Sequence, residues 1–311
     1  MAIEYLGLSS INGPLVVLEG LQDAFYDEIV EFTIEGKQQK MGRIIELNED
    51  KAVIQVFEGT ENMSLQNTHT KLTGRPMEVA VSPDMLGRTF NGIGEPVDGL
   101  GPIVSTDRRD VNGLPLNPVK REYPRNYIRT GISAIDGLTT LIRGQKLPIF
   151  SGNGLPHDQL AAQIVKQASL GEGAEGEFAV VFGAMGVKHD VAEFFRKTFE
   201  ESGVSDHVCM FLNLANDPVV ERLITPKVAL TAAEYLAFEC NMHILVILTD
   251  MTSFAEAMRE VSSSKGEIPS RKGYPGYLYS ELATIYERAG IVESANGSVT
   301  QLPILTMPND D

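Results

Sequence analysis

Short apolar runs that alternate with helical patterns dominate the chain from about residue 128 onward. The run at residues 178–182 has no polar position, which is typical of a parallel strand buried on both faces. The alternation therefore predicts an α/β domain with a mostly parallel sheet. The expected strands are residues 178–182, 208–212, 243–248 and 299–305. Between the first two, residues 190–202 predict a helix that ends at Gly203 and carries on one face Val191, Phe194, Phe195, Thr198 and Phe199.

Two proline signals follow the strand expected at residues 208–212. Asp217-Pro218 and Thr225-Pro226 each combine a capping residue with proline at the first helical position. The repeated signal predicts two successive helices rather than one.

The N-terminal part of the chain has a different pattern. Residues 1–74 contain short β-rich runs separated by turn clusters at residues 35–37 and 48–50, which predicts a small β-barrel. Residues 75–127 are rich in turn signals and are expected to form a connecting segment packed on the next domain. Residues 128–311 then form the α/β domain. The β-rich runs are residues 14–18, 29–34, 41–47 and 52–57.

A glycine-containing loop, SGNGLPHDQL at residues 151–160, lies between an apolar run and a helical pattern that begins at Asp158. That context is the one in which a phosphate-binding loop occurs. In a working loop, backbone N–H groups cradle the phosphates, a lysine neutralises them and a hydroxyl holds Mg²⁺. The residues that would form a degenerate, weak nucleotide site are Ser151, Gly152, Asn153, Gly154, His157 and Asp158.

The same loop has lost the groups that a triphosphate needs. With Gly152 as the first glycine, Pro156 or its neighbour stands at the second, His157 replaces the lysine and Asp158 replaces the hydroxyl. Proline removes an N–H donor, imidazole is largely neutral, and a carboxylate repels the anion. One like-charge contact near 4 Å costs roughly 4 kcal/mol at an effective dielectric of 20. On the loop alone, an ordinary strand–turn–helix connection remains the alternative.

A carboxylate follows the apolar run at residues 244–248. Asp250 comes directly after Thr249, which is the Walker B form, in which an aspartate orders Mg²⁺ beside the phosphate loop. The alternative is that Asp250 only caps the following helix. Because ligands of such sheets lie outside the carboxyl ends of the strands, Asp250 and the loop are expected at the same edge.

Composition limits the other functional classes. A formal charge of −16 argues against a nucleic-acid partner. The cysteines and histidines show no metal-ligand spacing, so no metal site is expected. The N-terminus lacks the features of a signal peptide, and the longest strongly apolar run is too short to span a bilayer, so no direct membrane insertion is expected.

Several long segments resemble the noncatalytic B subunits of vacuolar-type (V/A-type) rotary ATPases. The resemblance runs essentially from end to end, and TGISAIDGL followed by RGQKLPIFSGNGLPH is its most specific part. The other segments are FNGIGEPVDGLGP at residues 90–102, NLANDPVVERLITPKVALTAAEYLAFE at 213–239, HILVILTDMTSFAEAMREVS at 243–262 and RKGYPGYLYSELATIYERAG at 271–290.

The resemblance implies a fold in which a β-barrel precedes a RecA-like domain of the P-loop NTPase type and a C-terminal helical bundle. The bundle and the segment that supplies an arginine finger do not occur here, so we expect a truncated chain. In catalytic relatives the strand matching residues 178–182 leads to Gly-Glu-Arg, whose glutamate activates water. Here Gly186 is followed by Val187 and Lys188, so no catalytic residue is assigned.

The resemblance also implies the role of the whole protein. It would be a regulatory subunit that alternates with catalytic A subunits, contacts central-stalk subunits and couples ATP hydrolysis or synthesis to H⁺ or Na⁺ transport. It would lie on the cytoplasmic face of the membrane, held there by the complex, with ATP or ADP at subunit interfaces. Candidate interface residues are Arg271, Lys272 and Tyr274.

Three alternatives stay open. No tightly bound cofactor is expected, but the loop could bind Mg-ATP or ADP weakly as a regulatory site. A standalone P-loop NTPase would need a lysine near the loop, and Lys166 lies most of two helical turns downstream. The third alternative is that the chain is a pure binding module, which acts through contacts between its β-barrel and a partner protein.

Overall fold

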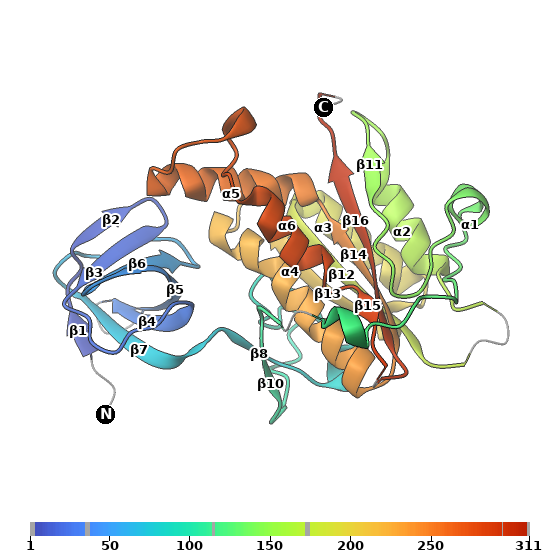
Figure 1. The fold of residues 1–311 in the computed structure, drawn as a ribbon, viewed down its shortest axis with the longest axis horizontal. Helices are drawn as coiled ribbons and strands as arrows, with labels where there is room; N and C mark the ends of the chain where they lie inside the picture. Colours follow the sequence, from blue (N-terminus) through green and yellow to red (C-terminus); the bar gives the residue numbers. More distant parts are fainter. Residues whose placement is uncertain (1–3, 35–37, 114–115, 172–174, 294, 310–311) are drawn as a thin grey trace. The chain divides into compact units, whose positions relative to one another are not determined.

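The computed structural model describes residues 4–34, 38–113, 116–171, 175–293 and 295–309 (Figure 1). By internal contacts the chain divides into two compact units. The first comprises Met1–Glu78, Asp217–Leu223 and Ala255–Leu278, and the second comprises Val79–Asn216, Ile224–Phe254 and Tyr279–Asp311. Among the described residues, no helix combines the length and the apolar character needed to cross a membrane.

The N-terminal part of the first unit is a curled, antiparallel sheet of seven strands (Figure 1). All four predicted strand runs are found as strands, and the turn predicted at residues 48–50 joins two of them, with Glu49 at a φ of 55°. The turn predicted at 35–37 lies outside the described residues. In spatial order the strands are β1 (Glu4–Leu6), β7 (Thr68–Pro76), β4 (Glu28–Ile34), β5 (Gln38–Asn48), β6 (Lys51–Val56), β3 (Leu15–Glu19) and β2 (Ser10–Asn12).

The core of this sheet comes from strand alternation. In β4, Val30, Phe32 and Ile34 point inward and are almost fully buried, while Glu31 and Thr33 between them are half-buried. Val16, Ile44 and Ile54 from other strands of the sheet join Val30 and Phe32 in one buried cluster. This shared burial explains why these β-branched and aromatic runs form strands.

The second unit is built on a parallel sheet. All four predicted strands occur, each extended by one or more residues, and the order is β11 (Ile149–Ser151), β16 (Ser298–Thr306), β14 (His243–Thr249), β12 (Phe178–Val187), β13 (Val208–Leu214) and β9 (Thr89–Asn91). Every pair along this path is parallel, and β15 (Gly290–Ile291) adds one antiparallel pairing with β16. The predicted α/β class with a mostly parallel sheet is therefore confirmed.

One outer strand comes from the segment that sequence analysis expected to be a connection. β9 pairs with β13, with Phe90 opposite Phe211, and the two rings stack with centroids 5.1 Å apart. The same stretch contains β10 (Arg108–Asp110), which pairs with β8 (Glu78–Ala80). Short 3₁₀ turns occur at Pro83–Met85, Pro118–Lys120, Ser205–His207 and Arg271–Gly273.

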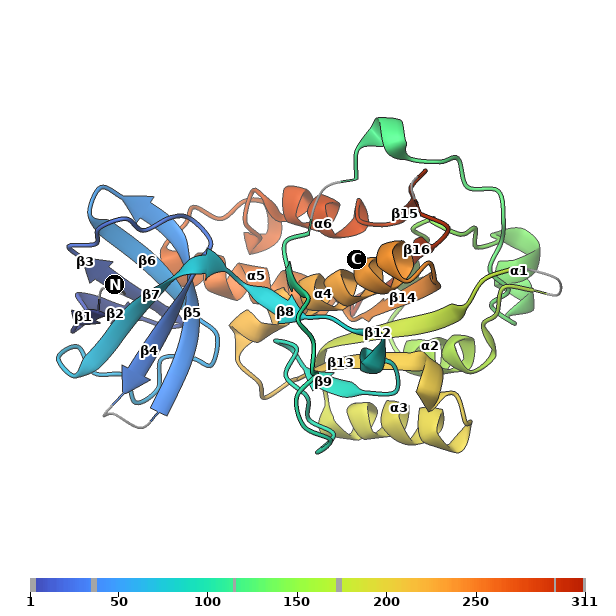
Figure 2. The same cartoon turned by 90° about the horizontal axis from the view of Figure 1, so that it is seen from below.

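Helices cover both faces of the parallel sheet. Figure 2 shows α2 (His157–Gln167) and α3 (His189–Glu201) on one face, with α4 (Val219–Glu234) and α6 (Leu278–Tyr286) on the other. On the α3 face, Phe195 and Phe199 pack on Phe182, whereas Phe194, expected on the same face, is 38% exposed. The remaining helices are α1 (Ser133–Leu138), α5 (Met251–Lys265) and a π-helical segment at Tyr235–Glu239.

The prediction of two successive helices after β13 is wrong. A single helix, α4, runs from Val219 to Glu234 with Pro226 inside it. An internal proline costs about 3 kcal/mol, because it removes a hydrogen bond and crowds the preceding turn. Burial of Val220, Ile224 and Val228 on either side offsets that cost, since each large apolar side chain contributes about 1.5–3 kcal/mol when fully buried.

Candidate functional site

The glycine loop lies where the sequence placed it, at the carboxyl edge of the parallel sheet. β11 ends at Ser151, which is buried, and α2 begins at His157. Between them Gly154 has a φ of +74°, and the Leu155 N–H donates to the Gly152 carbonyl at 3.2 Å. Pro156 precedes the helix and provides no side-chain cap. The loop is thus a tight turn, and its last position before the helix has no N–H to offer a ligand.

His157 and Asp158 form a pair in the first turn of α2. The His157 Nε2 atom lies 3.5 Å from Asp158 Oδ1, and about a quarter of each side chain is exposed. Burial raises the pKa of the Asp158 carboxyl; His157 opposes this shift, and the like charges of Asp250 and Asp190 add to it. A carboxylate therefore occupies the start of the helix, where a phosphate would otherwise be attracted.

Asp250 is held by three hydrogen bonds at the end of β14. Its Oδ1 accepts from the N–H groups of Thr252 at 2.9 Å and Thr306 at 3.2 Å, and its Oδ2 accepts from the Thr306 hydroxyl at 2.5 Å. The carboxylate thereby caps α5 and ties the end of β14 to the end of β16. Sequence analysis left two roles for Asp250, a Walker B aspartate or a cap of the following helix. Both place it at the end of β14, and the structure shows the capping contact.

These residues do not fit a bound magnesium triphosphate. Residues 152–157 contain no lysine or arginine, Asp158 stands where a Mg²⁺-binding hydroxyl would be required, and the Asp250 oxygens already accept hydrogen bonds. At the end of β12 the Gly186 N–H donates to Asn213 Oδ1 at 3.1 Å, and the exposed Lys188 follows where a catalytic glutamate would stand. We derive no hydrolytic step from this arrangement.

The candidate interface residues lie in a turn of the first unit. Tyr274 donates its hydroxyl to Glu256 Oε1 at 2.7 Å, and the Arg259 guanidinium lies 5.3 Å from the centre of its ring. Tyr274 therefore fastens the turn to α5, whereas Arg271 and Lys272 are exposed. The glycine loop residues belong to the other compact unit, and the interface role of the turn stays a prediction.

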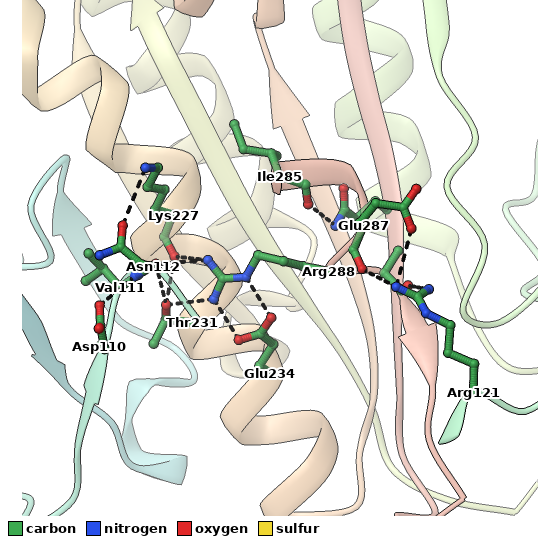
Figure 3. Close-up of polar contacts among 12 residues, drawn as sticks. Asp110, Val111, Asn112, Arg121, Lys227, Thr231, Glu234, Ile285, Glu287 and Arg288 are labelled. Carbon is green, nitrogen blue, oxygen red and sulfur yellow. Dashed lines mark hydrogen bonds and ion pairs between the residues drawn. The ribbon is translucent and has the colours of Figure 1, made fainter. Parts of the chain in front are cut away.

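A buried arginine that sequence analysis did not single out organises the polar contacts on the other face of the sheet (Figure 3). Arg288 is 4% exposed. Its Nε and Nη2 atoms each donate to one carboxylate oxygen of Glu234 at 2.6 Å, and its Nη1 atom donates to the Val111 carbonyl at 2.9 Å. Further bonds reach the Lys227 carbonyl and the Thr231 hydroxyl. All five guanidinium N–H groups can be satisfied in this way.

A second arginine, Arg121, binds the backbone on either side of Arg288. Arg121 donates to the carbonyl oxygens of Ala289 at 2.8 Å and Glu287 at 2.5 Å (Figure 3). The Glu287 side chain also pairs with Lys146. The sequence shows only the dipeptide Glu287-Arg288, which gives no sign that the two side chains bind different segments.

Fold and loop together define an α/β protein of the nucleotide-binding type whose phosphate loop lacks its cationic group. Two family models match the chain: the nucleotide-binding domain of the ATP synthase alpha/beta family over residues 131–311, and the beta-barrel domain of the same family over residues 8–74. The chain belongs to the ATP synthase alpha/beta family. The predicted fold class, including the N-terminal barrel, is confirmed.

Several relatives are named as beta chains or B subunits of V-type or A-type ATP synthases. The V-type ATP synthase beta chain 2 of Clostridium tetani is 64% identical over all of this chain and 68% of its own length. The V-type ATP synthase beta chain of Halothermothrix orenii is 62% identical over 99% of this chain and 66% of its own. The A-type ATP synthase B subunit of Aeropyrum pernix is 58% identical over the same shares. The resemblance to V/A-type B subunits is confirmed, and the chain spans about two thirds of the length of these relatives.

Proposed function

We propose that this chain acts as a noncatalytic, regulatory B subunit in a V/A-type rotary ATPase or ATP synthase. It alternates with catalytic A subunits, contacts the central stalk and contributes to coupling between ATP turnover and H⁺ or Na⁺ transport. It is held at the cytoplasmic face of the membrane through the complex. The names of the relatives support the subunit role, and the loop geometry supports its noncatalytic character.

The observation that carries the proposal is the start of α2. A helix N-terminus attracts anions through its free N–H groups and its dipole, an effect of about 0.3–1 kcal/mol at an exposed site. Asp158 places a negative charge there, and a like-charge contact near 4 Å costs roughly 4 kcal/mol at an effective dielectric of 20. Repulsion therefore exceeds attraction, and binding of a triphosphate would be weakened by about three decades.

A loop that binds little nucleotide suits a subunit whose conformation changes in response to the adjacent catalytic subunits. Its conformation then responds to contacts with the catalytic subunits, because no binding energy of its own favours one state. Asp250 supports such a response, because it joins two strand ends and a helix start. A shift at the start of α5 would therefore be transmitted to β14 and β16.

Calorimetric titration of Mg-ATP into this chain tests the proposal. We expect no saturable binding to the native chain. The variant Pro156→Gly/His157→Lys/Asp158→Thr restores the N–H donor, the cation and the hydroxyl. It should bind Mg-ATP with a dissociation constant in the micromolar to millimolar range. Micromolar binding by the native chain would refute the electrostatic argument and identify a live regulatory site. Steady hydrolysis by the purified native chain would instead favour a standalone NTPase.

A further inference from the structure

Three carboxylates lie at the carboxyl edge of the parallel sheet. Asp158 lies in the first turn of α2, Asp190 lies in the first turn of α3, and Asp250 follows β14. α2 and α3 pack next to each other on the same face of the sheet (Figure 2). Burial is the main cause of the raised pKa of Asp158, and the charges of Asp250 and Asp190 add to it. We call these residues the edge carboxylates.

A buried hydroxyl faces the same place. Thr249, the last residue of β14, is 1% exposed, and its Oγ1 atom makes no hydrogen bond with any described residue. Thr249 is paired with Ala184, and both Ala184 and Ile247 belong to the core packed against α2 and α3. Because side chains alternate along a strand, Thr249 points toward the first turns of these two helices. An unpaired buried hydroxyl carries a desolvation penalty, which a ligand that donates to it would remove.

The charges within reach are predominantly negative. His157 is the titratable base that pairs with Asp158, and Lys188 at the start of α3 is exposed. The dipoles of α2 and α3 contribute roughly half a positive charge each, which does not balance three carboxylates. A cation at this edge would relieve the mutual repulsion of the carboxylates.

We propose that the edge carboxylates and the Thr249 hydroxyl bind a primary ammonium group, such as a lysine side chain of an adjacent subunit presents. This inference rests on the proposed function, since a loop that held triphosphate would exclude it. An ammonium group has three N–H donors. Thr249 Oγ1, Asp158 Oδ2 and Asp190 Oδ2 offer acceptors. Asp190 Oδ1 accepts from the Val191 N–H at 3.0 Å, Asp158 Oδ1 lies 3.5 Å from His157 Nε2, and Asp250, whose oxygens are engaged, contributes charge alone.

A chelated metal fits less well. Within the described part of the chain, no group of three His, Cys, Asp or Glu side chains is placed to hold a metal ion. An ammonium group needs no closed coordination shell and reaches its acceptors at hydrogen-bond distances of about 2.8 Å, with a stem that fills the remaining space.

Thermal unfolding of this chain in different chloride salts, at constant total salt, tests the inference. The probes are ammonium, methylammonium, potassium and tetramethylammonium chloride. We expect ammonium and methylammonium to raise the Tm by about 3–5 °C at ten times the dissociation constant, relative to tetramethylammonium. Potassium should have a smaller effect, since it lacks directed donors.

Three variants separate binding from fold stability. Asp158→Asn should raise the Tm in the absence of ammonium, because it removes repulsion, and should abolish the ammonium-dependent shift. Thr249→Val keeps the shape of the side chain. It should raise about tenfold the ammonium concentration that gives half of the maximal Tm shift. Glu201→Gln, an exposed acid at the other end of α3, is the matched control and should respond as the native chain does.

Each other result overturns the inference. Equal shifts in all four salts show that no ammonium site exists. An equal effect of potassium and ammonium identifies an inorganic cation site instead. A shift that survives Asp158→Asn places binding elsewhere. The same samples are titrated with Mg-ATP, so that saturable ATP binding, which contradicts the proposed function, is distinguished from a failure of the ammonium site alone.

Discussion

Replacement of Arg288 by methionine should destabilise the second unit strongly. The guanidinium is 4% exposed and the Glu234 side chain 16% exposed, so the pair is shielded from water. Methionine fills similar volume but leaves the Glu234 carboxylate without its two arginine donors, and it removes one donor each from the Val111 carbonyl and the Thr231 hydroxyl. Removing one partner of a buried ion pair costs about 3–5 kcal/mol, and we expect a loss in that range.

Two further variants test the cause. Arg288→Lys retains the charge but cannot bond both Glu234 oxygens and the Val111 carbonyl in one plane, so about 1.5–3 kcal/mol should be lost. The double variant Arg288→Met/Glu234→Leu removes the stranded carboxylate and should recover a large part of the loss. The double-mutant cycle then gives a coupling free energy of about 2–3 kcal/mol.

The assay should report on this unit alone, because a chain with two compact units need not unfold in one step. Amide hydrogen exchange of peptides from residues 224–234, the part of α4 in the second unit, and from β10 meets that need. Arg196→Met is the control: Arg196 pairs with Glu193 and Glu200 on the surface, is 43% exposed, and should cost less than about 1 kcal/mol. A loss below about 1 kcal/mol for Arg288→Met, or strictly additive variants, would refute the reasoning.

Two other predictions follow from single contacts. Hydrogen bonding to Arg88 lowers the pKa of Asp98 to about 2, so its contribution of about 2 kcal/mol is present above pH 4 and is lost as the pH falls from about 4 to 2. Unfolding free energies across that range should show this slope in the native chain and lack it in Asp98→Asn. A Cβ on Gly297 would lie 1.8 Å from the Ala237 carbonyl oxygen, so Gly297→Ala should cost about 3 kcal/mol or more. Gly203→Ala, at a φ of +68° with no atom nearby, should cost only about 1 kcal/mol, and equal melting temperatures for the two variants would contradict this.

β12, β13 and β14 could be predicted because the centre of each is a short apolar run, and burial on both faces requires such runs. α4 could not, because local proline signals at Pro218 and Pro226 favour two helices, and only tertiary burial of the residues around Pro226 shows that one helix persists. β9 was missed for a related reason, since a three-residue strand in a turn-rich stretch is stabilised by a partner about 120 residues away.

The glycine loop was located correctly from strand, glycine and helix signals, because those are local. The role of Asp250 depends on Thr306, and that of Arg288 on Val111 and Glu234, so neither set of contacts could be read from neighbouring residues. The assignment of the loop residues as a weak nucleotide site stays a prediction.

The pairing of β9 with β13 bears on how the chain can be divided. A piece that began at residue 128 would keep the glycine loop but lose β9, β10 and the Val111 carbonyl that Arg288 binds. The free edge of β13 would then offer unpaired backbone groups next to the uncovered ring of Phe211, which is a template for strand addition by another molecule. A piece that keeps this edge paired therefore has to start near Val79, and shorter versions should aggregate although every residue of the loop is present.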